Sequence, residues 1–412
     1  MLLTKILNWL KRSKSEMHTN DYIYQRKDLP ASISKLGMGL LALGVVLGVV
    51  AFFVDHSRAV FNYLIAFTFL ISIGVGALFL IALDYTSGAD WSVPIRRVVE
   101  FFAAIIPILA VLVIPLLFNV GELFHWSHPE AVAEDKILQG KSSYLNVTFF
   151  IVRVFALIGI WSLFYFFIVK NSKKQDTTRD QKLTTKNLRL SAIFIPIFAV
   201  TITISAIDWL MSIEPHWFST MIGVYFFSGV VIAALAAVTL TTVLLKENGY
   251  LHPALTNDHL YSLGALLFAF INFWGYIAFS QYMLIWYADL PEETFWFMQR
   301  WEGSWSIFSI GLILIHFVVP YIALVSQPSK MNPKTLKFIS VWLLFAHLYD
   351  LFWFVMPEVN ELSAGYSFSW IDLVFPIAVV GIIILVFNMK AKKENLIPIG
   401  DPKLQRGLDF HL

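Results

Sequence analysis

The apolar residues of this chain form long, nearly unbroken runs instead of a short repeat. Residues 40–54, 101–118 and 377–387 are almost wholly apolar, and charged or turn-forming residues bound each run. A helix that crosses a hydrocarbon core about 30 Å thick needs roughly 20 such residues. Ten segments meet this requirement, namely residues 36–54, 60–83, 98–118, 147–169, 188–207, 219–245, 259–281, 304–325, 335–355 and 370–388.

The ten segments are expected to be helices. In lipid each backbone N–H and C=O group must be bonded within its own segment, which an open sheet cannot achieve. The sequence therefore predicts an all-α, polytopic membrane protein with about ten transmembrane helices. Eight helices between the first and the last would divide into two antiparallel four-helix bundles, with two peripheral helices. The expected domains are an N-terminal segment (1–35), a transmembrane domain (36–389) and a C-terminal tail (390–412).

The distribution of Lys and Arg predicts how the chain lies in the membrane. Of the 30 such residues, 25 fall on the side of both termini and the even-numbered connections, seven of them within residues 170–189. Basic residues accumulate on the cytoplasmic side, so both termini are expected in the cytoplasm. About 35 mixed residues precede the first long apolar run, which is not typical of a cleavable signal peptide. Arg153 lies inside a span, and the other side has Arg58, Lys136, Lys141 and Arg300.

Composition narrows the class of protein. The chain is 58% hydrophobic and 14% charged, whereas ordinary soluble domains are about 45–50% apolar and about 25% charged. Its formal net charge of +2 gives no indication of nucleic-acid binding. The chain has no cysteine, so it cannot by itself supply thiolates for zinc, for iron–sulfur clusters or for covalent haem attachment.

Several ionisable residues fall inside or at the ends of predicted spans, and five of them invite a functional hypothesis, because such a residue carries a penalty of about 2.5–3.5 kcal/mol at the bilayer centre. His347 and Asp350 are one turn apart, so both lie on one helical face and could handle protons as a pair. The alternative is that both only cap, or bond to, a neighbouring helix near the interface. His316, alone in its span, is more typical of a structural histidine. The five residues, four of them in the outer half, are Arg153, Asp208, His316, His347 and Asp350.

A second group of titratable residues follows the fifth span. Asp208, Glu214 and His216 lie within nine residues at the predicted outer surface and could accept and release protons. The segment could equally be a rigid interfacial turn, in which Pro215 breaks the chain and two tryptophans anchor it among the headgroups.

Two further sets suggest how protons could reach that surface. Asp84 and Glu100 lie at the predicted inner ends of the second and third spans beside Arg96 and Arg97, with Arg97 and Glu100 at ion-pairing spacing. Most such groups only stabilise the structure. The alternative is that Asp84 or Glu100 takes up protons at the cytoplasmic entrance of a proton path. In the seventh span, three polar residues at four-residue spacing form a stripe along the helix. Such a stripe either joins neighbouring helices or orders a chain of water molecules. The stripe consists of Asn272, Tyr276 and Ser280.

Three stretches, together with the ten-helix plan, resemble a membrane protein of bacterial alternative complex III, from the family of polysulfide-reductase type. They are residues 208–217, 268–287 and 289–294, and the run Phe-Ser-Gln-Tyr-Met-Leu-Ile-Trp-Tyr at 279–287 is long enough to be specific. The resemblance spans nearly the whole chain. It implies a component of a quinol:cytochrome c or quinol:oxidase oxidoreductase in the bacterial inner membrane.

The resemblance also implies partners and ligands. The expected partners are a homologous quinol-binding membrane subunit, a multihaem cytochrome c subunit, an iron–sulfur subunit, a terminal oxidase in some assemblies, and lipids. Haem c and iron–sulfur clusters would belong to those partners, while this chain would bind no redox centre and would contribute a surface for quinone, menaquinone included, and a proton path. No motif assigns the quinone-binding residues.

Two other functions compete with this one. A proton-coupled secondary transporter would have paired Gly- or Pro-interrupted helices that meet at the midplane. The third span has Pro107 and Pro115, but no matching pair appears in a second half of the chain. A cytochrome b-like subunit would hold haem between His316 and His347. Neighbouring helices usually bring side chains too close for that, and there is no second pair of helix histidines.

Overall fold

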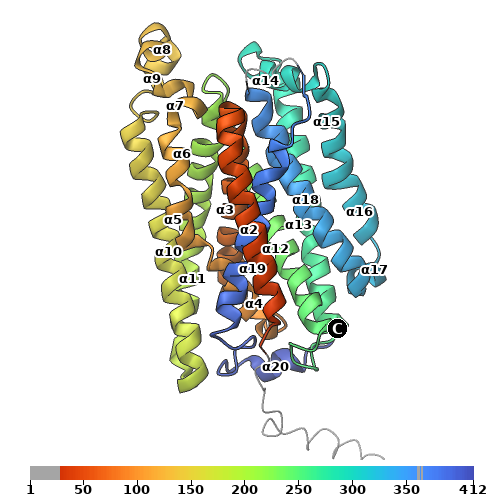
Figure 1. The fold of residues 1–412 in the computed structure, drawn as a ribbon. Helices are drawn as coiled ribbons and strands as arrows, with labels where there is room; N and C mark the ends of the chain where they lie inside the picture. Colours follow the sequence, from red (N-terminus) through yellow and green to blue (C-terminus); the bar gives the residue numbers. More distant parts are fainter. Residues whose placement is uncertain (1–27, 360–361, 363–364) are drawn as a thin grey trace, which may run out of the picture.

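The computed structural model describes residues 28–359, 362 and 365–412, so most of the N-terminal segment (1–35) lies outside the described residues. Within the described part, ten helical segments are long and apolar enough to cross a membrane, which confirms the all-α polytopic architecture. They stand side by side as one bundle (Figure 1). The single-helix spans are α2 (Ala31–Val54), α3 (His56–Ser87), α10 (Val147–Thr178), α11 (Gln181–Trp209), α12 (Ile222–Glu247), α13 (Asn257–Ala288), α18 (Pro333–Val355) and α19 (Ile371–Ala391).

Two spans are interrupted. The third covers Val93–Phe118, and proline, which cannot donate a backbone hydrogen bond, divides it at Pro107 and Pro115. The eighth contains a π-helical turn, a rare element that is frequent at functional sites. The pieces of the third span are η1 (Val93–Ile95), α4 (Arg96–Ala103), η2 (Ile106–Ile108), α5 (Leu109–Leu112) and α6 (Ile114–Phe118), and those of the eighth are α15 (Trp305–Leu312), η5 (Ile313–Val318) and α16 (Val319–Leu324).

The spans pack as the helix count suggested. The third span, α3, α10 and α11 form one four-helix group, and α12, α13, α18 and the eighth span form another, with α3 against α12 at the junction. The peripheral helices α2 and α19 pack on each other, and both also pack against α3. Their close approach needs glycine, because a Cβ at Gly381 would lie 2.6 Å from the backbone nitrogen of Leu41.

Short elements close the two ends of the bundle. The end at the top of Figure 1, here called the cap side, holds α7 (Val120–Leu123), η3 (His125–Ser127), α8 (Pro129–Glu134), α9 (Lys136–Lys141), η4 (Met211–Ile213), α14 (Pro291–Trp301) and η6 (Met356–Glu358). The opposite end, here called the basic side, holds residues 170–189, α17 (Gln327–Met331) and α20 (Leu404–Leu408).

The basic side is more ordered than expected. Residues 170–189 are not a loop of about 20 residues, because α10 and α11 continue through most of them and turn at Arg179, whose φ is 53°. The C-terminal tail also lies folded against this end. Asp401 forms an ion pair with Arg96, and Nε2 of His259 lies 2.7 Å from the carbonyl oxygen of Gly407.

Candidate functional site

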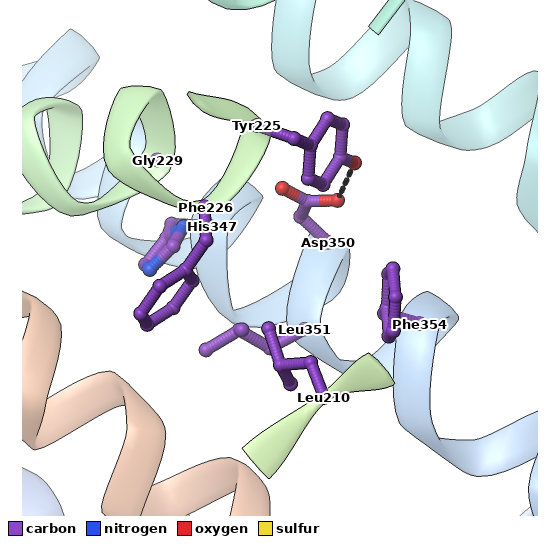
Figure 2. Close-up of a pocket in the computed structure, with 8 residues that line it drawn as sticks. All are labelled: Leu210, Tyr225, Phe226, Gly229, His347, Asp350, Leu351 and Phe354. Atoms are coloured by element: carbon purple, nitrogen blue, oxygen red, sulfur yellow. Dashed lines mark hydrogen bonds between the residues drawn. The ribbon is translucent and has the colours of Figure 1, made fainter. Parts of the chain in front are cut away.

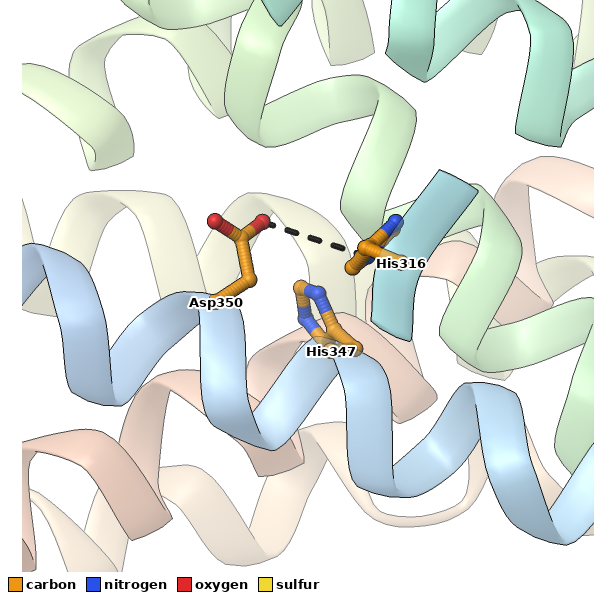
Figure 3. Close-up of side chains that lie close together, drawn as sticks. All are labelled: His316, His347 and Asp350. Atoms are coloured by element: carbon orange, nitrogen blue, oxygen red, sulfur yellow. Dashed lines mark ion pairs between the residues drawn. The ribbon is translucent and has the colours of Figure 1, made fainter. Parts of the chain in front are cut away.

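Three titratable side chains meet inside the second four-helix group. His316 comes from η5, and His347 and Asp350 come from successive turns of α18. Their potential ligand atoms all lie within 4.8 Å of one another, and all three side chains are buried. Figure 3 shows the ion-pair contact of 4.0 Å between Nε2 of His316 and Oδ2 of Asp350. We call these three residues the core cluster.

Neutral groups hold the carboxylate of Asp350. The hydroxyl of Tyr225 donates to Oδ1, and Nε1 of Trp274 donates to Oδ2 at 3.2 Å. The Trp274 ring also stacks on His316 with 3.8 Å between ring centroids. Asp350 therefore accepts hydrogen bonds from a phenol and an indole, and no Lys or Arg side chain of the described residues is bonded to it.

His347 lies beside a small cavity. Its Nε2 is 2.9 Å from Oγ of Ser72, while its Nδ1 has no hydrogen-bond partner among the described residues. A Cβ at Gly229 would lie only 2.8 Å from that Nδ1, so glycine is what lets α12 approach the ring. The cavity measures about 10 Å³ and is lined by Tyr225, His347 and Asp350 among other residues (Figure 2). That volume is about enough for one water molecule, with three polar groups around it.

The core cluster has the ligand types of a metal site, but other features fit proton handling better. A divalent ion there would face a single carboxylate, and an excess positive charge in a hydrocarbon core is costly. Haem does not fit between His316 and His347, because Trp274 covers the face of the His316 ring and the adjoining cavity is far smaller than a porphyrin. What the geometry provides is a row of proton donors and acceptors.

Asp208 belongs to a different arrangement. Its two oxygens accept hydrogen bonds from Nη2 and Nε of Arg153, each at 2.9 Å, and the Tyr144 hydroxyl adds a third at 3.0 Å. Both charged side chains are buried. The bidentate geometry is that of a strong, locked ion pair. The sequence contained both charges, but their pairing between α10 and α11 was not anticipated.

The titratable residues after the fifth span connect two parts of the cap side. Nδ1 of His216 lies 3.0 Å from Oε1 of Glu214, and its Nε2 lies 2.5 Å from Oδ2 of Asp135. The bond to Asp135 raises the pKa of His216, partial burial opposes this, and Glu214 adds to the rise. The same bond lowers the pKa of Asp135. Nζ of Lys141 donates to the carbonyl oxygen of Pro215 at 2.6 Å, which fixes α9 to the same turn.

On the basic side the predicted inner residues are neutralised by arginine. Glu100 forms the anticipated ion pair with Arg97 and accepts a hydrogen bond from Oγ of Ser172 at 2.6 Å. Arg97 also pairs with Asp176, whose side chain is 13% exposed, whereas that of Glu100 is 1% exposed. Asp84 accepts from Arg96, which Asp401 also holds. Neither Asp176 nor Asp401 was anticipated from the sequence.

The polar stripe of the seventh span does not point into the bundle. Tyr276 is 66% exposed, and Asn272 and Ser280 are half-buried, while Trp274 and Ile277 on the same helix face the core. The expectation that this stripe links the middle of the path is therefore corrected. Residues that do reach the core cluster, Ser72, Tyr225 and Trp274, were not singled out, because only the packing of α3, α12 and α13 around α18 brings them there.

Comparison of the chain with protein-family models gives no match, and comparison with curated proteins gives none either. The family resemblance therefore rests on the sequence motifs, and the functional assignment rests on the geometry of the buried polar residues.

Proposed function

We propose that this chain is a non-redox subunit of a quinol-oxidising respiratory complex in a bacterial inner membrane, and that its core cluster passes protons. The observation that carries the proposal is the burial of His316, His347 and Asp350 among neutral donors in a membrane bundle. Ionisable residues in such positions are expensive and are typical of proton relays. The motifs at 208–217 and 279–287 support the type of complex.

The proposed transfer uses groups that lie next to one another. A proton on Nδ1 of His347 passes to Asp350 through one water in the cavity that both residues line. Asp350 then exchanges it with Nε2 of His316, 4.0 Å from its Oδ2, after a small movement of either side chain. Tyr225 and Trp274 hold the carboxylate in position during this exchange. Ser72 fixes the orientation of the His347 ring.

The ends of the path follow from charge. The basic side is proposed to face the cytoplasm, in accord with the positive-inside rule. The proposed entry carboxylate there is Asp176, which shares Arg97 with Glu100 and is the more exposed of the two. On the cap side, Glu214 and His216 are the proposed release groups. Asp208 is proposed to be structural, because Arg153 neutralises it. Quinone and lipid are proposed to contact the lipid-facing helices, and haem and iron–sulfur clusters to belong to partner subunits.

Two experiments test the proposal. The first isolates the chain from native membranes and examines its partners, since a multihaem cytochrome c and an iron–sulfur protein are expected with it. A chain isolated alone that moves a solute with protons would instead be a secondary transporter. The second reconstitutes the complex with Asp350→Asn in vesicles and measures protons moved per electron.

Asparagine keeps the shape of Asp350; its Oδ1 can accept from Trp274 and its amide can donate to the hydroxyl oxygen of Tyr225, so assembly and quinol binding are expected to survive while the proton-to-electron ratio falls. Glu130→Gln is the matched control, because Glu130 is exposed on α8. An unchanged ratio in Asp350→Asn, equal to that of the control, would show that the core cluster only joins helices.

A further inference from the structure

The outward surface of one span, α13, carries two strongly exposed tyrosines. On α13, residues at spacings of three and four form an outward face, with Tyr276 66%, Phe279 62%, Met283 42% and Tyr287 82% exposed. We call these four residues the α13 face. The helix is buried over only 33% of its apolar window, as α10 is, yet it has the lowest mean hydropathy of the ten spans. If this face were turned to lipid, α13 would be expected to be among the most apolar of the ten spans.

The hydroxyl of Tyr276 is the clearest sign of a missing neighbour. It lies well inside the span and has no hydrogen-bond partner among the described residues. Half-buried Asn272 and Ser280 flank it one turn away on either side. In hydrocarbon, side chains of these types join one transmembrane helix to another. Asn272 donates to the carbonyl oxygen of Phe268 in its own helix at 2.7 Å, so the hydroxyl of Tyr276 is the group that a helix of another protein would satisfy.

Charge at the cap-side end of the same surface specifies that partner further. Asp289 and Glu292, directly after α13, are exposed and form no ion pair among the described residues. The nearest base in sequence, Arg300, is buried and is already paired with Glu358. Exposed Trp286 adds an aromatic edge at the same level. A complementary helix would therefore present Lys or Arg at its cap-side end.

We propose that the α13 face is the docking surface for a transmembrane helix of another subunit, with hydrogen-bonding side chains at its middle and Lys or Arg at its cap-side end. The inference rests on the proposed function in one respect, that the chain works in a complex. It adds which surface of the chain makes the contact and which chemistry the partner brings. Lipid, or a second copy of this chain, are the competing occupants.

The absence of cysteine allows a direct test with single-cysteine variants. Phe279→Cys and Met283→Cys are placed in the full chain, with Val46→Cys on α2 and Leu163→Cys on α10 as references of similar exposure, 62% and 56%. A lipid-soluble maleimide is applied to native membranes and to the purified chain. Relative to the two references, labelling at Phe279→Cys and Met283→Cys is expected to be several-fold lower in native membranes and to recover on purification.

Two substitutions sharpen the result. Tyr276→Phe removes only the hydroxyl, and Glu292→Lys reverses the charge, so each is expected to raise labelling of Phe279→Cys in native membranes and to reduce the size of the complex on native gels. A photoreactive residue at Met283 should yield an adduct whose peptide is a transmembrane helix with a basic cap-side end. Labelling of Phe279→Cys as complete as that of the references, or an adduct with a second copy of the chain, would overturn the proposal.

The same experiment separates this proposal from the proposed function. An adduct with a membrane protein of the stated chemistry that belongs to no quinol-oxidising complex would support the docking surface and remove the proposed function. A normal quinol-oxidising complex with a lipid-covered α13 face would do the reverse.

Discussion

Asp208 and Asp350 are two buried carboxylates in one bundle, and their partners give them opposite properties. Asp208 receives two hydrogen bonds from Arg153, so its charge is matched and its position is locked. Asp350 receives its bonds from the neutral side chains of Tyr225 and Trp274 and lies beside two histidines. Burial alone thus does not identify a proton-handling residue. What identifies one is a buried acid without a matched cation but with other titratable groups in reach.

The largest expected effect tests the locked pair. Arg153→Met leaves the charge of Asp208 buried without its cation, so the free energy of unfolding should fall by about 3–5 kcal/mol. Unfolding in detergent, followed by circular dichroism, measures the change. The double variant Arg153→Met with Asp208→Leu removes both charges and should regain most of the loss. A single variant as stable as the parent chain would mean that Asp208 is not held by this pair.

The next effect tests the packing around the core cluster. In Gly229→Ala the added methyl group collides with the His347 ring, so the free energy of unfolding should fall by about 1–3 kcal/mol. Displacing the ring should also lower the proton-to-electron ratio. Gly159→Ala on α10 is the matched control, because its Cβ would meet nothing within 4 Å. Equal stability of the two variants in detergent unfolding would contradict the tight contact at Gly229.

A smaller effect compares the tyrosines that donate to the two acids. Tyr225→Phe removes one of the two donors to Asp350, and a loss of about 1 kcal/mol in the free energy of unfolding is expected. Tyr144→Phe should cost less, because Asp208 keeps both hydrogen bonds from Arg153. Paired unfolding measurements on the two variants decide the order. The reverse order would show that the two hydrogen bonds from Arg153 do not compensate Asp208 for the loss of the Tyr144 hydroxyl.

The smallest effect concerns the cap side, where charge is solvated rather than buried. The pKa of His216 is raised from 6.5 in the folded chain. The stabilisation of the fold by protonated His216 is therefore complete below about pH 6.5 and is lost as pH rises through the raised pKa. The pKa of Asp135 is lowered from 3.8, so its contribution is present above that pH and is lost as pH falls through the lowered value. Hydrogen exchange of α8 and α9 should therefore quicken above neutral pH.

His216→Gln provides the control for that measurement, because glutamine does not titrate. Exchange in this variant should depend on pH only through the chemistry of exchange itself. If the parent chain and His216→Gln show the same profile, the bond between His216 and Asp135 does not hold the cap.

The sequence was sufficient for features that depend on local pattern. Apolar run length located all ten spans, and the three-residue spacing of His347 and Asp350 correctly placed both on one face. Hydropathy could not show that α10 and α11 continue past the membrane, because the charged residues 170–189 form helix as readily as loop. Hydropathy likewise could not show whether the stripe at Tyr276 faces the core or the outside of the bundle, because residues on an exposed and on a buried helix face have the same spacing.

Pairings between distant segments were the part that the sequence could not supply. Arg153 and Asp208 are 55 residues apart, and Tyr225 and Asp350 are 125 apart. Such contacts depend on which helices become neighbours and on their rotation, and neither is encoded in a local repeat. One signal was available: opposite charges at similar depth in consecutive spans, as for Arg153 and Asp208, are expected to pair because each alone is costly in lipid.

The ion pair between Arg96 and Asp401 has a consequence for how the protein is made. The two residues are 305 positions apart, and at about 5–20 residues per second the ribosome delivers the second roughly 15–60 seconds after the first. Throughout that interval Arg96 depends on Asp84, 12 residues before it, as its counter-charge. The ion pair that holds the C-terminal segment at the basic end of the bundle can therefore form only after the last of the ten spans has been synthesised.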